Sequence, residues 1–580
     1  MKYINVAKAN CKNCYKCLKV CPVKSIKYDD NKIEVIDNGC ILCGRCINIC
    51  PQHAKSLEHD ITNLLEKLAS TKGKKIASLA PSYISSFGVK NKLKLVTALK
   101  KLGFDELGET AIGAHAVSLE YIKLMENKSR DNIITTCCPT VVFLVQKYFP
   151  DLISSLAPVA SPMETHGKIL KETYGEDSFV VFFAPCISKL EEARLLSTNS
   201  IDGVITFRQL RNLLLLNDIT LEEQEETPLL NGTSHSSIYP VFEGIIDDVK
   251  HNIPKSSEIE NNYSFASVQG IDNVIDCLTE IRKGNIHNAF IEASSCNGSC
   301  VNGPENIKIE EKAITKNLEI RKYIKAQKSF EERENTGLPL YKEWQSHPFK
   351  EKIPDEDTII KILSKIGKNK PEDELNCGSC GYPSCRAKAI AVYQGKAQLY
   401  MCMPFMNQIS ESFANVTLSV SPDYIVAVDQ NLNICESNLA TQKLLGLQRN
   451  DIIGRPISDF FDPQEFAQSI VEKKSIPQHK VKYNVRKVVV NQTMVYITEQ
   501  NISVAFMQDI TTQEYETEKL NKVKLDTMTM AQNVIDKQMR VAQEIASLLG
   551  ETTAETKVTL TKLKDLIVYD GKCDDDKLMH

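Results

Sequence analysis

Five cysteines in three separated patches are the residues of this 580-residue chain best suited to chemistry. Soft thiolates brought together from distant loops are suited to iron–sulfur chemistry. The patches therefore predict one shared iron–sulfur site. They read Thr136-Cys137-Cys138-Pro139, Pro185-Cys186-x-x-Lys189-x-x-Glu192 and Glu292-x-x-x-Cys296-x-x-x-Cys300-x-x-Gly303.

A repeated cysteine motif precedes these patches. Residues 1–57 contain two copies of C-x2-C-x2-C-x3-C-P, the pattern of two-cluster bacterial ferredoxins, in which the fourth cysteine of each run binds the other cluster. A zinc ribbon would need four cysteines per site in two pairs, which makes zinc the weaker alternative. The sharing rule assigns one cube to Cys11, Cys14, Cys17 and Cys50, and the other to Cys40, Cys43, Cys46 and Cys21.

A third iron–sulfur candidate lies at 377–402. Gly378 and Gly381 let this loop fold tightly around a cube and turn backbone amides towards its sulfurs. The run resembles a small 4Fe–4S module found beside several anaerobic redox enzymes, and structural zinc is the alternative. Its four cysteines are Cys377, Cys380, Cys385 and Cys402.

Between about 70 and 365, short apolar runs alternate with amphipathic helices. Strands are predicted at 76–80, 179–183 and 289–291, and each is followed closely by a residue pattern that could carry function. This alternation favours an α/β domain whose functional loops lie at the ends of the strands.

Composition limits the class of protein. Hydrophobic residues make up 42% and charged residues 25%, and the formal net charge of −4 gives no reason to expect nucleic acid or membrane as a partner. No apolar run approaches the roughly 20 residues that span a bilayer, and the first residues lack the apolar core of a signal peptide. Twenty cysteines in such a chain favour metal ligation over disulfides, so we expect a reducing, cytoplasmic, anaerobic protein.

The region from 413 to 512 has no metal-like cysteine spacing. Strands are predicted at 425–429, 434–438, 481–490, 493–500 and 502–508, with a helix through 444–446 and Asp509-Ile510-Thr511 at the end. This order resembles a PAS domain. Cys435 lies in one of these strands without a flavin-type motif, and we expect it to pack in the core.

A helical segment is predicted from 513 to 570. Apolar residues at helical spacing form a stripe along this segment. The stripe fits either a helix that caps the PAS core or a signalling coiled coil that dimerises the protein. Gly550 followed by Glu551 indicates a helix end and a second helix, and Cys573 in the charged tail is expected to be inert. The stripe consists of Leu520, Val523, Met528, Met530, Val534, Ile535, Met539, Val541 and Ile545.

The order of the three cysteine patches behind a ferredoxin-like segment resembles the FeFe-hydrogenases over roughly residues 1–310. The resemblance implies an H-cluster, which is a 4Fe–4S cube bridged to a diiron site carrying CO and cyanide. Two ferredoxin-type 4Fe–4S clusters and one further 4Fe–4S cluster would accompany it. The cube ligands would be Cys138, Cys186, Cys296 and Cys300, with Cys300 as the bridge.

The expected architecture is multidomain α/β and α+β. It comprises a 2x4Fe–4S ferredoxin-like domain at 1–57, an α/β FeFe-hydrogenase H-cluster domain at 70–365, a 4Fe–4S module at 366–410, a PAS domain at 413–512 and C-terminal helices at 513–570.

The resemblance also assigns roles around the diiron site. Lys189 resembles the lysine that donates to the cyanide ligands, and Glu192 completes its motif. Ser82, after Pro81, resembles a second donor to the same ligands. Cys137 corresponds to the thiol that exchanges protons with the diiron site as general acid and base.

The family's proton path continues through glutamates on a helix that we expect at 114–125. There this chain has Glu120, but Tyr121 and Leu124 at the relay positions, while Ser161 matches the relay serine. A retained Cys137 with a broken relay predicts slow proton exchange, which suits a sensor.

Three further positions depart from the family pattern. Val141 stands where most catalytic members have tryptophan, and Ala184 and Ser294 stand where they have methionine. Smaller side chains at these positions would change the shape and polarity of the diiron pocket.

The leading hypothesis is a sensory FeFe-hydrogenase of low activity that binds or slowly oxidises H2. No kinase, phosphatase or cyclase motif follows residue 515 and no Gly-rich phosphate loop is present, so the signal would pass through the PAS domain to a separate kinase or phosphatase. A ferredoxin-type redox carrier, diiron maturation proteins and a homodimer are the other expected partners. The alternatives are a working hydrogenase exchanging electrons with ferredoxin, and a relay of ordinary cubes without the diiron site.

Overall fold

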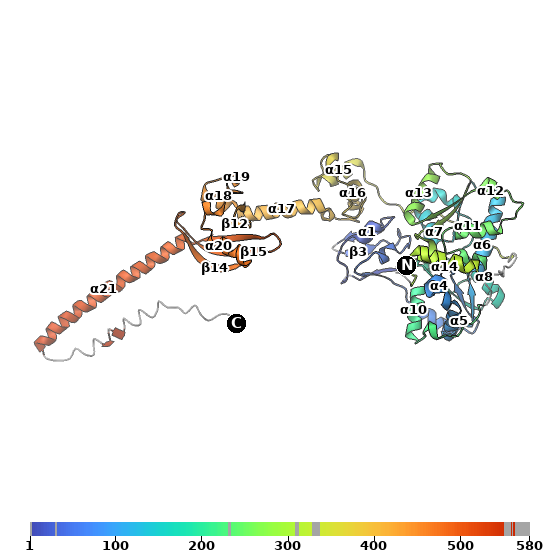
Figure 1. Cartoon of the computed structure of the whole chain (residues 1–580), viewed down its shortest axis with the longest axis horizontal. Helices are drawn as coiled ribbons and strands as arrows, with labels where there is room; N and C mark the ends of the chain where they lie inside the picture. Colours follow the sequence, from blue (N-terminus) through green and yellow to red (C-terminus); the bar gives the residue numbers. More distant parts are fainter. Residues whose placement is uncertain are drawn as a thin grey trace. The chain divides into compact units, whose positions relative to one another are not determined.

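The computed structural model describes residues 3–7, 9–29, 32–229, 234–307, 312–326, 337–549, 558–559 and 561–562. The chain divides into two compact units, Met1–Met406 and Asn407–His580, and each is described by itself. Figure 1 shows the elements in chain order.

The N-terminal domain is a small ferredoxin-like fold. Strand β1 (Ile4–Val6) pairs antiparallel with β4 (Lys55–Leu57), which joins the two ends of the domain, and β2 (Ile26–Asp29) forms a hairpin with β3 (Lys32–Val35). Two short helices, α1 (Lys16–Val20) and α2 (Arg45–Asn48), follow the cysteine loops. Each helix is preceded by a residue in the left-handed region, Tyr15 and Gly44, which turns the loop back on itself.

The next domain is built on two parallel sheets, as the alternating pattern predicts. The first sheet has the order β6 (Glu106–Glu109), β5 (Lys75–Leu79), β8 (Phe179–Ala184), β9 (Gly203–Thr206), and the second β10 (Ser264–Gln269), β11 (Ala289–Ser294), β7 (Asn132–Ile134). The strands predicted at 76–80, 179–183 and 289–291 are confirmed as β5, β8 and β11. Strand β8 is apolar and buried almost throughout, as expected where helices cover both faces of a sheet.

Helices surround both sheets. The helix predicted at 114–125 is confirmed within α6. The helices around the sheets are α3 (Thr62–Ser70), α4 (Tyr83–Phe87), α5 (Lys92–Lys101), α6 (Ala111–Glu126), α7 (Pro139–Tyr148), α8 (Pro162–Tyr174), α9 (Ser188–Arg194), α10 (Phe207–Leu216), α11 (Gly244–Asn252), α12 (Ile259–Asn262), α13 (Ile271–Arg282) and α14 (Ala313–Lys325), with a short 3-10 helix η4 (His235–Ile238).

The segment before Met406 closes with a small helical module. Helix α15 (Glu356–Ser364) packs on α16 (Cys385–Tyr393), and Ile359 and Leu363 share a core with Ala389 and Cys402. The module therefore includes α15, which the sequence assigned to the preceding domain. Helix α17 (Met403–Val420) follows directly after Cys402.

The second unit contains a five-stranded antiparallel sheet in the order β13-β12-β16-β15-β14. Its core is dense with aliphatic and aromatic side chains, among them Phe466, Val490 and Met507. The strands are β12 (Tyr424–Val428), β13 (Ile434–Ser437), β14 (Ile476–Tyr483), β15 (Val488–Ile497) and β16 (Ile502–Asp509), and the helices are α18 (Leu439–Leu445), α19 (Arg449–Ile452) and α20 (Gln464–Glu472).

Two predictions for this sheet are wrong. The strand expected at 481–490 is a hairpin, because the chain turns at 484–487, where Val485 is 90% exposed and Lys487 has a positive φ. Cys435 does not pack in the core. Side chains alternate along β13, so the buried Ile434 directs its neighbour Cys435 to the exposed face.

One long helix, α21 (Thr511–Leu549), follows the sheet. Its first turn is fixed by a hydrogen bond from Val489 N–H to Thr511 Oγ1. Beyond that turn the apolar stripe is open to solvent, with Leu520 56% and Val534 60% exposed, so capping of the PAS core does not account for the stripe. The second helix expected after Gly550 and the tail with Cys573 lie largely or wholly outside the described residues.

In the part of the chain that the structure describes, no helix is long and apolar enough to cross a membrane.

Candidate functional site

The ends of β5, β7, β8 and β11 converge on a cavity of about 110 Å³. All five cysteines of the three patches line it, together with the loop after β5 and residues around η4 and α11. The sequence prediction that distant patches share one site therefore agrees with the structure. The lining cysteines of the patches are Cys137, Cys138, Cys186, Cys296 and Cys300.

The four predicted cube ligands lie close enough together to affect one another's ionisation. Burial raises the pKa of Cys186 to about 11, and the Cys138 thiol adds to the shift. Burial also raises the pKa of Cys296 and Cys300, with further increases from the neighbouring thiols of the group. Such thiols stay protonated on their own, and bound iron supplies the charge that holds them as thiolates. The donor set therefore fits an iron–sulfur cube.

No three His, Cys, Asp or Glu side chains converge closely enough to hold a single metal ion, among the residues that the structure describes. A cube places four irons and four sulfides between its ligands, so its thiols are spread around a larger volume.

Serine hydroxyls lie beside the ligand sulfurs, which the sequence did not indicate. Ser188 Oγ lies 3.4 Å from Cys186 Sγ, and Ser295 Oγ lies 3.6 Å from Cys138 Sγ. Hydrogen bonds to sulfur tune the reduction potential of a cluster. These two hydroxyls are therefore candidates for setting the potential of the cube.

Lys189 forms a buried ion pair on the wall of the cavity. Its Nζ lies 2.6 Å from Glu192 Oε2, one turn further along α9, and the two side chains are about 10% exposed. Burial opposes the charged form, but Glu192 and the nearby thiols outweigh it and raise the pKa of Lys189. The lysine thus presents a fixed positive charge towards Cys137, Cys186 and Cys300.

Pro81 and Ser82 also line the cavity, directly after β5. The Ser82 side chain is fully buried, and its Oγ has no hydrogen-bond partner among the described residues. An unpartnered buried hydroxyl is costly. Ser82 is therefore available to donate to an acceptor held in the cavity.

Cys137 contacts a tyrosine rather than a carboxylate. Tyr121 Oη lies 3.4 Å from Cys137 Sγ and accepts a hydrogen bond from the Thr136 backbone N–H. Burial raises the pKa of Cys137 to about 12, although the contact with Tyr121 favours the thiolate. The sequence placed Tyr121 at a relay position, and the structure brings this residue to the thiol.

The other predicted relay residues lie elsewhere. Glu120 is partly exposed on α6, where its Oε1 lies 2.6 Å from Lys123 Nζ. Ser161 is buried as the N-cap of α8, and its Oγ accepts a hydrogen bond from the Glu164 backbone N–H. The structure therefore does not bring Glu120 to the cavity, and it gives Ser161 a structural contact.

Of the three positions that depart from the family pattern, one lines the cavity. Ser294 is on its wall, with Oγ 3.2 Å from Ser299 Oγ. Val141 and Ala184 are fully buried in the surrounding core.

Glu292 opens the third patch, and the sequence alone indicates no role for it. It lines the cavity, and its Oε2 accepts hydrogen bonds of 3.0 Å from the backbone N–H groups of Ile245 and Ile246. Burial raises the pKa of Glu292 to about 7, against the effect of these bonds. This carboxyl group can therefore change protonation state near neutral pH.

The ferredoxin-like cysteines form two groups, and the second of them includes Cys21 from the first run. Cys21, from the first run, lies close enough to Cys40, Cys43 and Cys46 to raise their pKa, after the larger effect of burial. In the first group, Cys11 and Cys14 similarly raise the pKa of Cys17, again after burial.

The second ferredoxin-like group adjoins the cavity. Cys43 lines the cavity wall and contributes to the raised pKa of Cys296, after burial and the nearer thiols. Gly44 meets Pro304 so closely that an added Cβ would lie 2.6 Å from the proline. A side chain at position 44 would therefore push the second ferredoxin-like group away from the cavity.

The third cysteine group lines a smaller cavity of about 20 Å³ formed by Cys377, Cys380, Cys385 and Cys402. This module packs on the ferredoxin-like domain. Lys24 Nζ donates to Leu18 O and Gly381 O, both at 3.1 Å, and Gly381 lies against the Leu18 side chain. The two ferredoxin-like cysteine groups, the group at 377–402 and the central cavity are thus connected by direct contacts.

Four family models match this chain. Residues 73–304 match "Iron only hydrogenase large subunit, C-terminal domain", residues 3–51 a 4Fe-4S dicluster domain, residues 373–404 an Fe-S cluster family and residues 412–511 the PAS fold.

Similar proteins include hydrogenases and one differently named group. The chain is 28% identical over 293 residues to iron hydrogenase 1 of Clostridium pasteurianum, covering 42% of this chain and 50% of that protein. It is 23% identical over 289 residues to the nuclear prelamin A recognition factor of Xenopus laevis, covering 39% of this chain and 63% of that protein. A solved FeFe-hydrogenase variant from Chlamydomonas reinhardtii is 18% identical, with a TM-score of 0.39, covering 47% of this chain and 90% of that chain.

The family-model matches agree with the positions of the cysteine groups. The chain spans about half the length of the first two curated hydrogenases that it matches. The chain therefore combines a region that matches the iron-only hydrogenase family model, residues 73–304, with regions that match a 4Fe–4S dicluster domain and the PAS fold.

Proposed function

We propose that this protein is a sensory FeFe-hydrogenase that binds H2, or oxidises it slowly, at an H-cluster. The observation that carries the proposal is the cavity in which four predicted cube ligands meet Cys137, the Lys189–Glu192 pair and the unpartnered Ser82 hydroxyl. A plain cube needs only the four thiolates. The additional thiol, cation and hydroxyl therefore favour a second, anionic metal subsite beside the cube.

In this proposal each side chain of the site has one task. Cys138, Cys186, Cys296 and Cys300 would hold the cube, and Cys300 would be shared with a diiron subsite that would supply the hydrogen-splitting chemistry. Lys189 donates to the anionic ligands of that subsite while Glu192 fixes its ammonium group. Ser82 donates to the same acceptors, and Cys137 accepts or returns a proton at its sulfur.

The signal route that we propose follows the cysteine groups. Electrons would pass from the cavity to the second ferredoxin-like cube at Cys43, and from that cube to the first one and to the module at 377–402, since Cys21 and Cys380 both lie near Lys24. Cys402 immediately precedes α17, and α17 leads in sequence to the first PAS strand, β12. A change in the charge of the last cube would thus act at the start of the helix that enters the PAS domain.

A rate measurement separates the sensor from a working hydrogenase. Because the acidic relay is replaced by Tyr121 and Leu124, we expect hydrogen oxidation with a dye as electron acceptor to be at least about 100-fold slower than in a relay-containing hydrogenase assayed in parallel. Equal turnover would favour the working hydrogenase. A protein that binds its full iron but never gains the diiron subsite would instead be a cube relay.

Hydrogen–deuterium exchange tests whether the PAS domain responds to hydrogen. Hydrogen–deuterium exchange of backbone amides should differ between argon and hydrogen within 424–509 of the loaded protein. Identical exchange there under both gases would remove the reason to assign the PAS domain a role in the response.

We further propose that α21 pairs with α21 of a second copy. A seven-residue repeat along one face consists of Leu520, Thr527, Val534 and Val541, and all four side chains are exposed. An amphipathic helix of 39 residues with a bare apolar face gains its stability from a partner helix.

Val534→Glu should therefore dissociate the dimer. In the proposed dimer this substitution would place two like charges against each other across the seam, and we expect the dissociation constant to rise at least about 100-fold. Gln543→Glu, on the opposite face of the same helix, is the matched control. Sedimentation equilibrium would show a mass twice that of the chain for the control and the single-chain mass for Val534→Glu; a single-chain mass for the unmutated protein would refute the pairing.

Ser82→Ala tests the second donor to the diiron ligands. Loss of one hydrogen bond should shift the infrared bands of metal-bound cyanide while leaving the iron content unchanged. Ser85→Ala is the control, because Ser85 is buried one turn later and its Oγ donates to the Ser82 carbonyl. Cyanide bands at the same positions in Ser82→Ala and the unmutated protein would show that Ser82 makes no such bond.

A further inference from the structure

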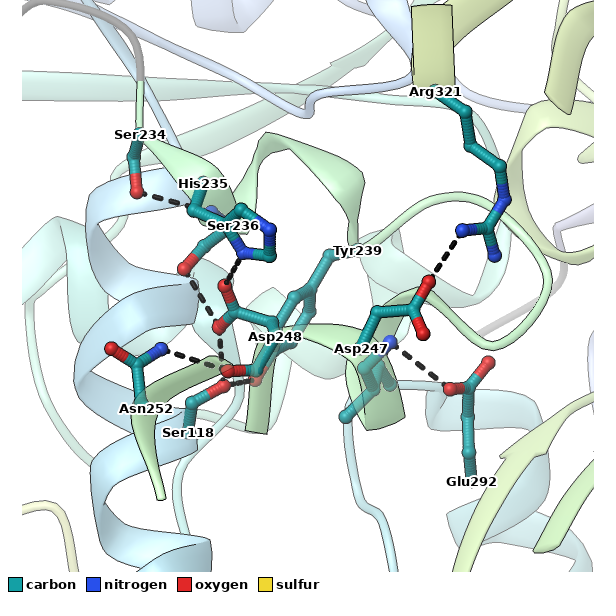
Figure 2. A network of polar contacts seen from close by, with 11 residues as sticks. Ser118, Ser234, His235, Ser236, Tyr239, Asp247, Asp248, Asn252, Glu292 and Arg321 are labelled. Atoms are coloured by element: carbon teal, nitrogen blue, oxygen red, sulfur yellow. Dashed lines mark hydrogen bonds and ion pairs between the residues drawn. The ribbon is translucent and has the colours of Figure 1, made fainter. Parts of the chain in front are cut away.

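A line of hydrogen-bonded side chains begins on the cavity wall. Tyr239, which lines the cavity, has its Oη 2.7 Å from Ser118 Oγ on α6. Ser118 Oγ in turn donates to Asp248 Oδ2 on α11, at 2.6 Å. Figure 2 shows these three side chains directed towards one another from three separate elements.

The line continues from Asp248 towards solvent. Asp248 Oδ1 lies 2.9 Å from His235 Nδ1, and the His235 side chain is 16% exposed, whereas that of Asp248 is fully buried. His251, an exposed residue of α11, stacks on His235 with ring centroids 4.0 Å apart. The hydrogen-bonded residues therefore connect a buried wall of the cavity to an imidazole that reaches the surface.

Packing alone explains only part of this arrangement. A buried carboxylate needs several donors, and Asp248 receives them from Ser118, Ser236 and His235. That requirement does not explain why the line extends past Ser118 to a tyrosine on the cavity wall. The Tyr239 end lies near Cys137, since this thiol is among the groups that raise the pKa of Tyr239, after the larger effect of burial.

The glutamate relay of the family is interrupted in this chain, as the sequence predicted. Glu120 is partly exposed and paired with Lys123, and Tyr121 and Leu124 occupy the other relay positions. A cavity that exchanges protons with solvent needs some other connected set of donors and acceptors.

We propose that Tyr239, Ser118, Asp248 and His235 form a proton path between the cavity and the surface. This inference rests on the proposed function, since the path has a use only if protons are made or consumed in the cavity. It assigns Tyr239 the inner end and His235 the outer end.

The hydrogen-bond directions fit such a transfer. Ser118 donates to Asp248, so the Tyr239 hydroxyl donates to Ser118. A proton leaving the cavity would add to Tyr239 Oη as the Tyr239 proton moves to Ser118 Oγ and the Ser118 proton moves to Asp248 Oδ2. Protonated His235, no longer paired with a carboxylate, would release a proton from Nε2 to water. One proton enters and one leaves, and only O–H and N–H bonds change.

Ser118→Ala tests the path with the least disturbance. It removes one hydroxyl and leaves Asp248 with its donors Ser236 and His235. Ser236→Ala is the matched control, because Ser236 Oγ donates to the same Asp248 oxygen, at 2.8 Å, but lies off the line from the cavity. Both serines are fully buried.

The measurement is the rate at which the CO and cyanide infrared bands of loaded protein change when argon is replaced by hydrogen. We expect Ser118→Ala to slow this change at least about tenfold and Ser236→Ala to leave it within about twofold. Equal rates in Ser118→Ala and the unmutated protein would overturn the path. Absence of the bands from the unmutated protein would instead contradict the proposed function.

A second readout does not depend on rate. The infrared difference spectrum between argon and hydrogen should contain the C=O band of a protonated carboxyl group that shifts in D2O and disappears in Asp248→Asn. A carboxyl band that persists in Asp248→Asn would belong to another group, with Glu292 on the cavity wall as the first to examine, and would remove Asp248 from the path.

Discussion

Lys189→Met should abolish retention of the diiron subsite while leaving the iron–sulfur cubes in place. The substitution removes the buried cation beside Cys137 and Cys186 and leaves Glu192 as an unpaired buried carboxylate. Breaking a buried pair in this way costs about 3–5 kcal/mol of folding free energy. The anionic ligands that Lys189 is proposed to hold would lose their donor, and the uncompensated charge of Glu192, which acts on Cys137, would repel them.

The control for this variant is Lys171→Met. Lys171 is equally buried in the same domain and lies 2.9 Å from Asp202, but it is not on the cavity wall. Both variants should lose stability in thermal unfolding. Only Lys189→Met should lose the infrared bands of metal-bound CO and cyanide, and retention of these bands at full intensity would contradict the role of Lys189.

Cys186→Ser should remove the central cube and everything attached to it. A serine oxygen is a poor substitute for a soft thiolate at iron, and the remaining three ligands would leave one iron open to solvent. We expect the protein to contain about four irons fewer per chain after cluster reconstitution, and none of the diiron bands. The ferredoxin-type signals in electron paramagnetic resonance should remain.

Cys277→Ser is the matched control, because Cys277 is a half-buried cysteine of α13 that belongs to none of the cysteine groups. Its iron content and spectra should equal those of the unmutated protein. An unchanged iron content in Cys186→Ser would mean that Cys186 is not a cube ligand.

The chemistry of the cysteines could be predicted from the sequence because metal ligation depends on spacing and residue type. The two C-x2-C-x2-C-x3-C-P runs indicated that Cys21 joins Cys40, Cys43 and Cys46, and these thiols do lie together. Buried parallel strands such as β8 were equally accessible, since a short run of apolar residues followed by a functional loop has few other interpretations.

What the sequence could not indicate depends on contacts between elements. Ser118, His235, Tyr239 and Asp248 are common residue types on three elements, and no spacing rule connects them before the chain folds. The hairpin at 484–487 was missed because the apolar side chain of Val485 continues the pattern of a strand, and only tertiary packing leaves it exposed. Cys435 faces outwards because of the register of β13, which a one-residue shift would have reversed.

An infrared spectrum of anaerobically matured protein, recorded under argon and then under hydrogen, tests the central claim most directly. Metal-bound CO and cyanide absorb in a region free of protein bands, so the spectrum reports on the diiron subsite alone. The proposed function predicts such bands under argon and a shift in their positions under hydrogen. Protein with its full complement of iron but no such bands, after a competent maturation system has acted on it, would contradict the assignment of a hydrogen-binding site.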